Sequence, residues 1–357
     1  MTGVAPSGRH AAQALAFAYV FVLACLAVLG AAVHFLGDPR AGEQIVSLDL
    51  RVAHHHMPKI AEAPPTAAPP VAPEPGAAAP PAAPPPVEAP AGLGVANPAL
   101  IEKTPQGPLP RIADDGTPPL RAYGMVVPTG GKPRIAIVIN GLGLSAKATA
   151  AAIAELPPAV TVAFFPYAND VQHWVTLARQ KGHEVLLEVP MEPYDFPDSD
   201  PGQYTLRSGV GEDSNTKRLV WSLTRFTGYV GVTNLLGGRL LSDANALEPM
   251  MTYLARRGLM FYDNGSATRS VAPDVAARLG APFSQATSTI DTIQAAMEID
   301  HRLSDLETEA RAKGSASGSG FIYPVTVDRV GAWARGLPGR GLVLVPVSTL
   351  VTPPEKH

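Results

Sequence analysis

Residues 134–143 read RIAIVINGLG, and this stretch decides the fold. Residues 134–139 form an apolar run rich in β-branched side chains, which is typical of a strand buried on both faces of a parallel sheet. The residues that follow, Asn140-Gly141-Leu142-Gly143, mark the end of that strand. Because parallel strands need a crossover connection, which is usually a helix, we expect helices to alternate with strands along the chain.

That alternation continues through residues 132–352. Further strands are expected at residues 161–165, 184–189, 229–233, 259–262, 282–286, 317–322 and 342–346. Helices are expected at residues 145–155, 171–181, 212–226, 245–257, 273–279, 292–313 and 325–335. The pattern predicts an α/β domain of about eight mostly parallel strands, arranged as a barrel or as a doubly wound sheet.

The chain upstream of this domain has a different character. Residues 11–36 are apolar and contain no Asp, Glu, Lys or Arg, which predicts a transmembrane anchor behind a cytoplasmic tail at residues 1–10. Of the 38 prolines, 19 lie between Pro58 and Pro119, so residues 37–131 are expected to form a disordered, Pro/Ala-rich linker. We therefore expect a single-pass inner-membrane protein whose domain faces the periplasm, with a short tail at residues 353–357.

Charge and cysteine content exclude several classes of protein. The net charge is −3 and 17% of the residues are charged, so no basic excess favours nucleic acid as a partner. The only cysteine, Cys25, lies within the apolar run at residues 11–36. A disulfide framework, a thiolate zinc site and a cysteine nucleophile are therefore excluded from the domain.

The glycines after the first strand also match a dinucleotide-binding motif, Gly141-Leu142-Gly143-Leu144-Ser145-Ala146. Such a motif requires an acidic residue at the end of the next strand to bind the ribose. The first acid beyond that strand is Asp170, several residues too late. The glycines are better explained by a tight turn.

Several ordered segments carry a resemblance to a known family: RIAIVINGLG, VAFFPYAND, GHEVLLEVPMEP, GYVGVTNLLGGR, FYDNGS and LVPVSTL. Across residues 132–352 the chain resembles the divergent polysaccharide deacetylases. The resemblance implies a distorted (β/α) barrel related to esterases that act on N-acetylated sugars. It also implies a divalent metal such as Zn²⁺, held by one Asp and two His, that polarises an amide carbonyl and activates water.

The positions that match the family's metal ligands carry other residues here. Asn140 and Gly141 stand where the family has two aspartates, and Leu235 and Phe321 stand where it has histidines. An amide is a weak neutral ligand, and hydrocarbon side chains offer no lone pair. We therefore expect no metal site and no bound cofactor, and we predict little or no deacetylase activity.

A few polar residues at the expected strand ends remain candidates. Glu188, Glu192 and Asp263 are the possible catalytic remnants, and Asp291 also matches an acid of the family. Turn formation by Asp263 and loop hydrogen bonding by the two glutamates are the structural alternatives. The candidate ligand-binding residues are Asn140, Asn234, Arg239, Asp263 and Tyr323.

Three functions stay open from the sequence. The first is a catalytically impaired deacetylase-like protein that binds envelope polysaccharide or peptidoglycan. The second is an active metal-dependent carbohydrate deacetylase that uses Asp263, Glu188 and Glu192. The third is a membrane-anchored scaffold whose partner is an envelope protein.

Overall fold

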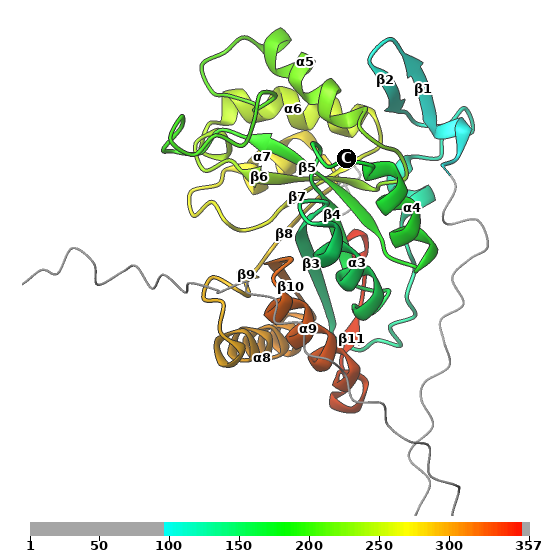
Figure 1. Cartoon of the computed structure of the whole chain (residues 1–357), viewed down its shortest axis with the longest axis vertical. Coiled ribbons are helices and arrows are strands. Elements are labelled where there is room, and N and C mark those ends of the chain that lie inside the picture. The colour runs from blue at the N-terminus through cyan, green and yellow to red at the C-terminus, as the bar shows by residue number, and fades with distance from the viewer. Residues whose placement is uncertain (1–95, 352–357) are drawn as a thin grey trace, which may run out of the picture. The chain divides into compact units, whose positions relative to one another are not determined.

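A curled sheet of parallel strands forms the centre of the domain. The structure is a computed structural model, and it describes residues 96–351. The strand order is β8-β7-β6-β5-β4-β3-β10-β9, and β11 pairs with the beginning of β3 (Figure 1). The strands are β3 (Arg134–Leu142), β4 (Thr161–Phe164), β5 (Val185–Met191), β6 (Gly231–Leu236), β7 (Met260–Asp263), β8 (Phe283–Gln285), β9 (Ser288–Thr289), β10 (Ser315–Phe321) and β11 (Val343–Leu344). The predicted α/β class and the parallel strands are confirmed, and the sheet curls into a half-barrel.

Helices cover the outer face of this sheet (Figure 1). They are α3 (Ala146–Glu155), α4 (Val171–Gln180), α5 (Glu212–Leu223), α6 (Ala244–Arg256), α7 (Ala272–Leu279), α8 (Ala296–Lys313) and α9 (Pro324–Gly336). Short 3₁₀ turns lie at η2 (Leu240–Ser242), η3 (Pro338–Arg340) and η4 (Val347–Leu350). The α-helices begin and end where capping residues stand. The Ser145 hydroxyl caps the start of α3, and Gly280 ends α7 in the left-handed conformation.

The strand β3 is buried on both faces, as its sequence predicts. Ile135, Ile137 and Ile139 point outward into the core formed with the helices. Ala136 and Val138 point inward, into a second and smaller core inside the curled sheet. Because both faces are apolar, burial stabilises this strand on either side by roughly 1.5–3 kcal/mol for each large side chain.

One tyrosine spans the interior of the half-barrel. The Tyr262 hydroxyl on β7 lies 2.9 Å from Ser317 Oγ on β10, although four strands lie between these two in the sheet. The connection from β8 to β9 links the two edges of the sheet, because the Thr287 N–H donates to the Ser317 carbonyl on β10 at 2.7 Å. The strand order and this contact together show how far the sheet curls.

The folded part begins earlier than the predicted boundary at residue 132. Within the expected linker the chain forms η1 (Pro98–Leu100), a hairpin of β1 (Ile101–Thr104) and β2 (Gly107–Pro110), and α2 (Pro119–Tyr123). Their apolar side chains are buried against the domain: Leu100 is 1% exposed, Leu109 3% and Tyr123 8%. Because of its high proline content this region was predicted to be linker, whereas part of it contributes to the core.

The amino end of the sheet is tied together by Glu184, which immediately precedes β5. Its carboxylate accepts hydrogen bonds from the Met125 N–H, the Thr161 hydroxyl, and the N–H and hydroxyl of Ser348. Burial raises the pKa of Glu184, and these bonds oppose that effect. The carboxylate thereby joins the N-terminal segment, β4 and the C-terminal turn η4.

The expected anchor at residues 11–36, the cytoplasmic tail and most of the linker lie outside the described residues, as does the C-terminal tail. Between residues 96 and 351 none of the helices combines the length and the apolar character that a bilayer crossing requires.

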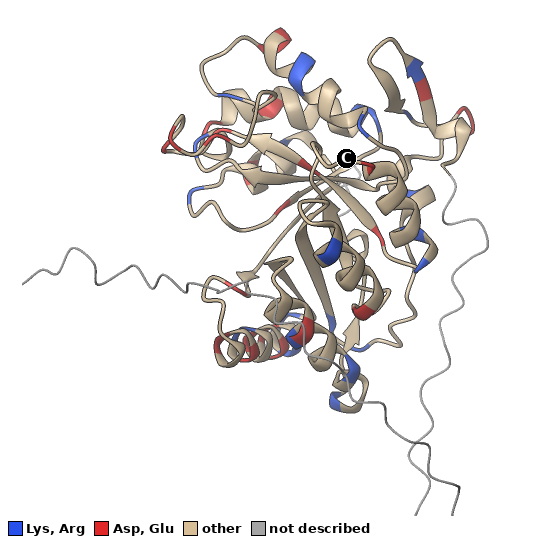
Figure 2. Cartoon of the chain, viewed as in Figure 1, with Lys and Arg blue, Asp and Glu red and all other residues tan. Residues whose placement is uncertain are grey.

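Acidic and basic residues are interspersed along α8 (Figure 2).

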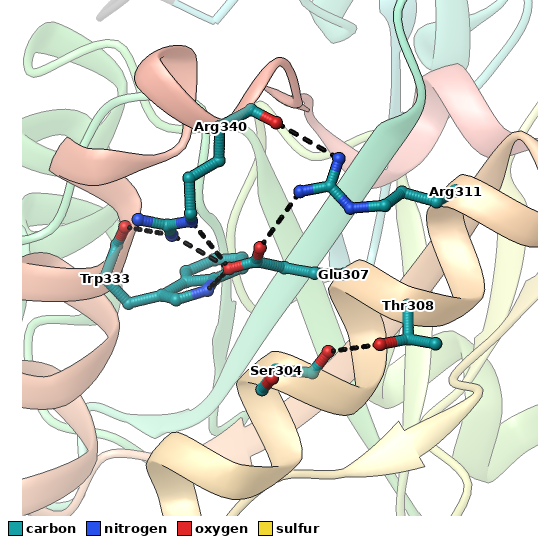
Figure 3. A network of polar contacts seen from close by, with 6 residues as sticks. All are labelled: Ser304, Glu307, Thr308, Arg311, Trp333 and Arg340. Carbon is teal, nitrogen blue, oxygen red and sulfur yellow. Dashed lines mark hydrogen bonds and ion pairs between the residues drawn. The ribbon is translucent and has the colours of Figure 1, made fainter.

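Helices α8 and α9 are joined through Glu307 (Figure 3). Its carboxylate accepts hydrogen bonds from Trp333 Nε1 at 2.8 Å, Arg340 Nε at 2.9 Å and an Arg311 guanidinium nitrogen at 3.4 Å. The Glu307 side chain is only 14% exposed, so these charge-assisted bonds are shielded from water better than an ordinary surface pair.

We predict that Glu307→Gln lowers the free energy of unfolding by about 1–2 kcal/mol, because the charge shared by these donors is lost. Urea unfolding of the full chain provides the measurement. Glu309→Gln is the matched control, since Glu309 lies on the same helix and, within residues 96–351, forms an ion pair with Lys313 alone, whose side chain is 71% exposed. The control should change stability by less than about 0.5 kcal/mol. Equal effects of the two substitutions would contradict the assigned role of Glu307.

Candidate functional site at the carboxyl end of the sheet

An interior polar cluster lies at the carboxyl end of the strands. It consists of the inward-facing Asn140, Glu188, Thr233, Tyr262 and Ser319, all buried. Register places them together: Glu188 pairs with Thr233 across β5 and β6, and Thr233 pairs with Tyr262 across β6 and β7. Ligands of parallel α/β sheets bind at this end of the strands, so we regard the cluster and the loops around it as the candidate site.

Two members of this cluster have unmet hydrogen-bonding capacity. Asn140 Nδ2 donates to Ser319 Oγ and to the Gly320 carbonyl, both at 2.9 Å. Among the described residues, however, Asn140 Oδ1 has no hydrogen-bond partner, and neither has Thr233 Oγ1, although both atoms are buried. Such atoms are costly to bury without a partner, which makes them places where a hydrogen-bond donor is favoured.

Glu188 is the carboxyl group at the centre of the cluster. It accepts a short hydrogen bond from the Gly141 N–H, the only hydrogen bond that it makes within the described part of the chain. Burial raises the pKa of Glu188 to about 8, and the Gly141 bond opposes that shift only partly. At neutral pH the group is therefore mostly protonated and carries a proton that it can donate to a neighbouring acceptor.

Glu192 has a different environment from Glu188. Its carboxylate accepts hydrogen bonds from the Ser208 N–H at 2.7 Å and the Ser208 hydroxyl at 2.6 Å, which fixes the loop between β5 and α5. Arg239 approaches it at 3.9 Å and keeps a side chain that is 55% exposed at the rim. The structure thus gives Glu192 a role in loop anchoring and leaves Arg239 accessible.

Asp263 does not join Glu188. Tyr262 faces the interior of the half-barrel, so the next residue along β7 faces the outside. There the Asp263 carboxylate accepts from the Gly265 N–H at 3.0 Å and from Gln285 Nε2 at 3.4 Å, and it contacts the Ser270 hydroxyl. Burial raises the pKa of Asp263. Its contacts match the turn chemistry considered from the sequence.

Asn234 is also occupied by contacts with its neighbours. Its Nδ2 donates to the Leu236 carbonyl at 2.8 Å and to Asn264 Oδ1 at 2.9 Å, while its Oδ1 accepts the Asn264 N–H at 2.9 Å. These bonds clasp the loops that follow β6 and β7. Tyr323 occupies the N-cap position of α9 without a capping hydrogen bond from its side chain, and its half-buried ring lies 5.0 Å from the ring of Phe321.

Three further tyrosines near this end of the sheet have separate environments. Tyr194 is 51% exposed at the rim, and the Arg269 guanidinium lies 5.6 Å from the centre of its ring. Tyr262 is fully buried, as described above. Tyr167 accepts a hydrogen bond from the Tyr204 N–H at 2.9 Å in a neighbouring aromatic cluster. Tyr194 is thus the most exposed of these three tyrosines, and its ring contacts Arg269 and Gly238.

The residues present do not fit a metal. A Cβ atom on Gly141 would lie 2.5 Å from the Phe321 ring, so this ring fills the space beside Gly141. Asp291 fixes the backbone there, because its carboxylate accepts the Phe321 N–H at 2.6 Å. Between residues 96 and 351, no three His, Cys, Asp or Glu side chains are grouped closely enough to hold a metal ion. Glu188 alone offers one carboxyl group where a Zn²⁺ site needs three or four ligands.

The sequence did not single out Thr233 or Ser319 as site residues. The alternation Ser317-Gly318-Ser319-Gly320 is the signal that could have revealed the serines, since period-2 spacing places both on one face of a strand. Their small side chains, however, are equally typical of a loop, and only the sheet register identifies the face as the interior one.

By its fold and candidate site, this chain is an α/β protein with a curled parallel sheet and a candidate ligand site at the carboxyl end of the strands. The chain belongs to the divergent polysaccharide deacetylase family, whose sequence profile matches residues 137–351.

Similar proteins cover most of the same region. The chain is 27% identical over 223 residues to the uncharacterized protein YibQ of Escherichia coli K12, a match that spans 62% of this chain and 68% of that protein. It is 25% identical over 205 residues to an uncharacterized Haemophilus influenzae protein, spanning 57% and 72% of the two chains. The crystal structure of an uncharacterized Agrobacterium tumefaciens C58 protein superposes with a TM-score of 0.67 and 39% identity, covering 69% of this chain and all of that one.

We predict that Glu188→Gln changes how stability depends on pH. Burial raises the pKa of Glu188 from 4.5 to about 8, so the folded state retains a proton that the unfolded chain releases. Its contribution to stability is full below about pH 4.5 and is lost as the pH rises to about 8. The substitution should flatten the fall in unfolding free energy between these values by on the order of 1 kcal/mol per pH unit. Urea unfolding at several pH values measures this, with the exposed Glu155→Gln as control. Parallel curves for wild type and Glu188→Gln would refute it.

A second prediction tests whether Phe321 fills the space beside Gly141. Gly141→Ala should lower the unfolding free energy by about 3 kcal/mol or more, from backbone strain at φ +87° together with the clash against the Phe321 ring. Gly116→Ala is the matched control, since Gly116 has φ +82° and no atom within 4 Å of the added Cβ. In a Phe321→Ala background the cost of Gly141→Ala should fall toward that of the control, and additive effects in this double-mutant cycle would argue against the contact.

Proposed function

We propose that this protein binds N-acetylated envelope polysaccharide at the carboxyl end of its sheet and has little or no metal-dependent deacetylase activity. The observation that carries the proposal is the filled metal position, where Phe321 packs on Gly141 and Asn140 replaces a carboxylate. Family membership supplies the class of ligand. The surrounding rim keeps groups that suit a sugar.

The rim offers the two kinds of contact that carbohydrates use. Tyr194 is 51% exposed, and a sugar ring that displaces the Arg269 guanidinium can stack its C–H side on the aromatic ring. Arg239, with its side chain 55% exposed, supplies donors for hydroxyl, carboxylate or acetamido oxygens. The buried cluster at the same end of the sheet holds the largely neutral Glu188 and Asn140, whose Oδ1 has no hydrogen-bond partner among the described residues.

A protein partner is the second candidate, and one specific observation favours it. Large apolar side chains stand exposed after β3 and β9, at the end of β6 and at the start of α8: Leu144 is 52% exposed, Ile293 57%, Leu236 41% and Met297 86%. Exposed apolar groups around one end of a domain are typical of interaction sites. A scaffold role at the same end of the sheet would use these side chains.

The location of this activity is part of the proposal. The apolar residues 11–36 would anchor the chain in the inner membrane, and the Pro/Ala-rich linker would extend the domain into the periplasm. Protease protection of spheroplasts tests the orientation: the domain should be digested from outside in intact spheroplasts, whereas digestion only after lysis would place it in the cytoplasm.

The central test combines binding and chemistry. Detergent-solubilised full chain should bind chitooligosaccharides or peptidoglycan fragments in calorimetry and release no acetate, with or without added Zn²⁺. Tyr194→Ala and Arg239→Ala should each weaken binding by about tenfold, because each removes one contact of roughly 1–2 kcal/mol. Arg256→Ala, an exposed arginine on α6, is the matched control and should leave the affinity unchanged.

Two outcomes would contradict this function. Acetate release that EDTA abolishes would show that metal chemistry survives despite the substituted positions. Retention by envelope proteins without any binding to glycan would favour the scaffold, and loss of that retention in Leu236→Ser would assign it to the apolar side chains of the rim.

A further inference from the structure

A groove of about 430 Å³ lies beside the site, between the loop after β4 and the carboxyl-terminal part of α5. Pro166 and Tyr167 form one wall, and Trp221 and Arg225 form the other. The exposed Gln172, at the start of α4, also borders it. No residue assigned to the proposed glycan site lines this groove.

The walls are rigid and aromatic. Tyr204 stacks on Trp221 with ring centres 3.8 Å apart and planes inclined by 6°, and the Arg225 guanidinium lies 4.5 Å from the centre of the Trp221 ring. The Tyr167 ring is tilted against Trp221 at 4.8 Å, and its hydroxyl accepts the Tyr204 N–H. Within residues 96–351 Trp221 Nε1 donates no hydrogen bond, and it is not among the buried polar atoms, so this N–H is accessible to a new acceptor.

The N-terminal segment of the domain lies close to the same groove. An Arg225 guanidinium nitrogen donates to the Gln106 carbonyl at 3.4 Å, in the turn of the β1–β2 hairpin. The described part begins near the opposite end of α4, where the Asn97 N–H donates to the Tyr123 hydroxyl at 3.1 Å. Helix α4 has ten residues and is therefore about 15 Å long.

The residues just upstream are rich in proline. Residues 83–90 read APPPVEAP. A polyproline II chain rises about 3.1 Å per residue, so the ten or so residues from Val87 to Asn97 can span about 30 Å, which exceeds the length of α4. The proline run can therefore reach the groove from the place where the described part begins.

We propose that the aromatic groove binds residues 83–90 of the same chain in a polyproline II conformation. Prolines lose little entropy on docking because their backbone is already restricted, and grooves lined by aromatic rings suit their flat apolar faces. The exposed carbonyls of this helix accept hydrogen bonds, for which Trp221 Nε1 is the donor at the wall. Glu88 supplies a negative charge that suits Arg225.

Docking would hold the end of the linker against the domain. The free length of the spacer would then be set by the residues upstream of residue 83, and the orientation of the domain relative to the linker would be restricted. The proposal is independent of whether the rim binds glycan.

The test uses the full chain with a single fluorescent label. Cys25→Ala removes the native thiol, and Val87→Cys carries a bimane, whose emission is quenched by contact with tryptophan. We expect emission to rise at least twofold with Trp221→Phe and to stay unchanged with Trp333→Phe, which alters a tryptophan on α9. Unchanged emission in Trp221→Phe would overturn the proposal.

A second variant keeps the domain intact. Replacing Pro84, Pro85 and Pro86 by serine alters only residues outside the described domain, and it should raise the emission as much as Trp221→Phe does. Persistent quenching in this variant would show that the proline run is not what binds. Dilution supplies the last control: quenching that falls with protein concentration would assign the contact to a second copy of the chain and overturn the intramolecular form.

Discussion

Two carboxyl groups buried on the inner side of the sheet, Glu184 and Glu188, are the constraint around which the domain is built. Neither can be ionised in an apolar interior without partners. Glu184, at the amino end, is satisfied by four hydrogen bonds that join β4, the N-terminal segment and the C-terminal turn. Glu188, at the carboxyl end, receives a single bond from Gly141. The carboxyl group at the amino end of the sheet thus has its hydrogen bonds made within the domain, whereas the one at the carboxyl end can form more.

The substitutions at the carboxyl end form a consistent set. A metal ion would offset the charge of several carboxylates gathered in one buried place. Asn140, Leu235 and Phe321 do not hold a cation. An aspartate added among them would therefore carry a buried charge that no cation balances. Replacing the charged positions by an amide, a glycine and hydrocarbon keeps the interior neutral, and burial keeps Glu188 largely neutral as well. The interior at this end of the sheet is therefore neutral without a bound cation.

Much of the candidate site could be placed at one end of the sheet before its geometry was known. Asn140 and Glu188 follow apolar strands directly, and strand ends in parallel sheets meet at one edge. Sequence could not tell that Asp263 turns away from Glu188. Strands buried on both faces are apolar throughout, so alternation carries no sign of which side is the interior. The contacts of Glu192 with Ser208 and of Asn234 with Asn264 depend on loop conformation, which spacing does not encode.

The sequence by itself determined the order of strands and helices, their approximate limits and which residues stand at the strand ends. These depend on local apolar runs, helix caps and residue identity at matched positions. Only the tertiary structure decided that residues 98–123 belong to the core, that Tyr262 reaches Ser317 across the interior, and that the Phe321 ring covers Gly141. Each of those contacts joins segments far apart in the chain, and curvature and register of the sheet, which no local pattern specifies, bring them together.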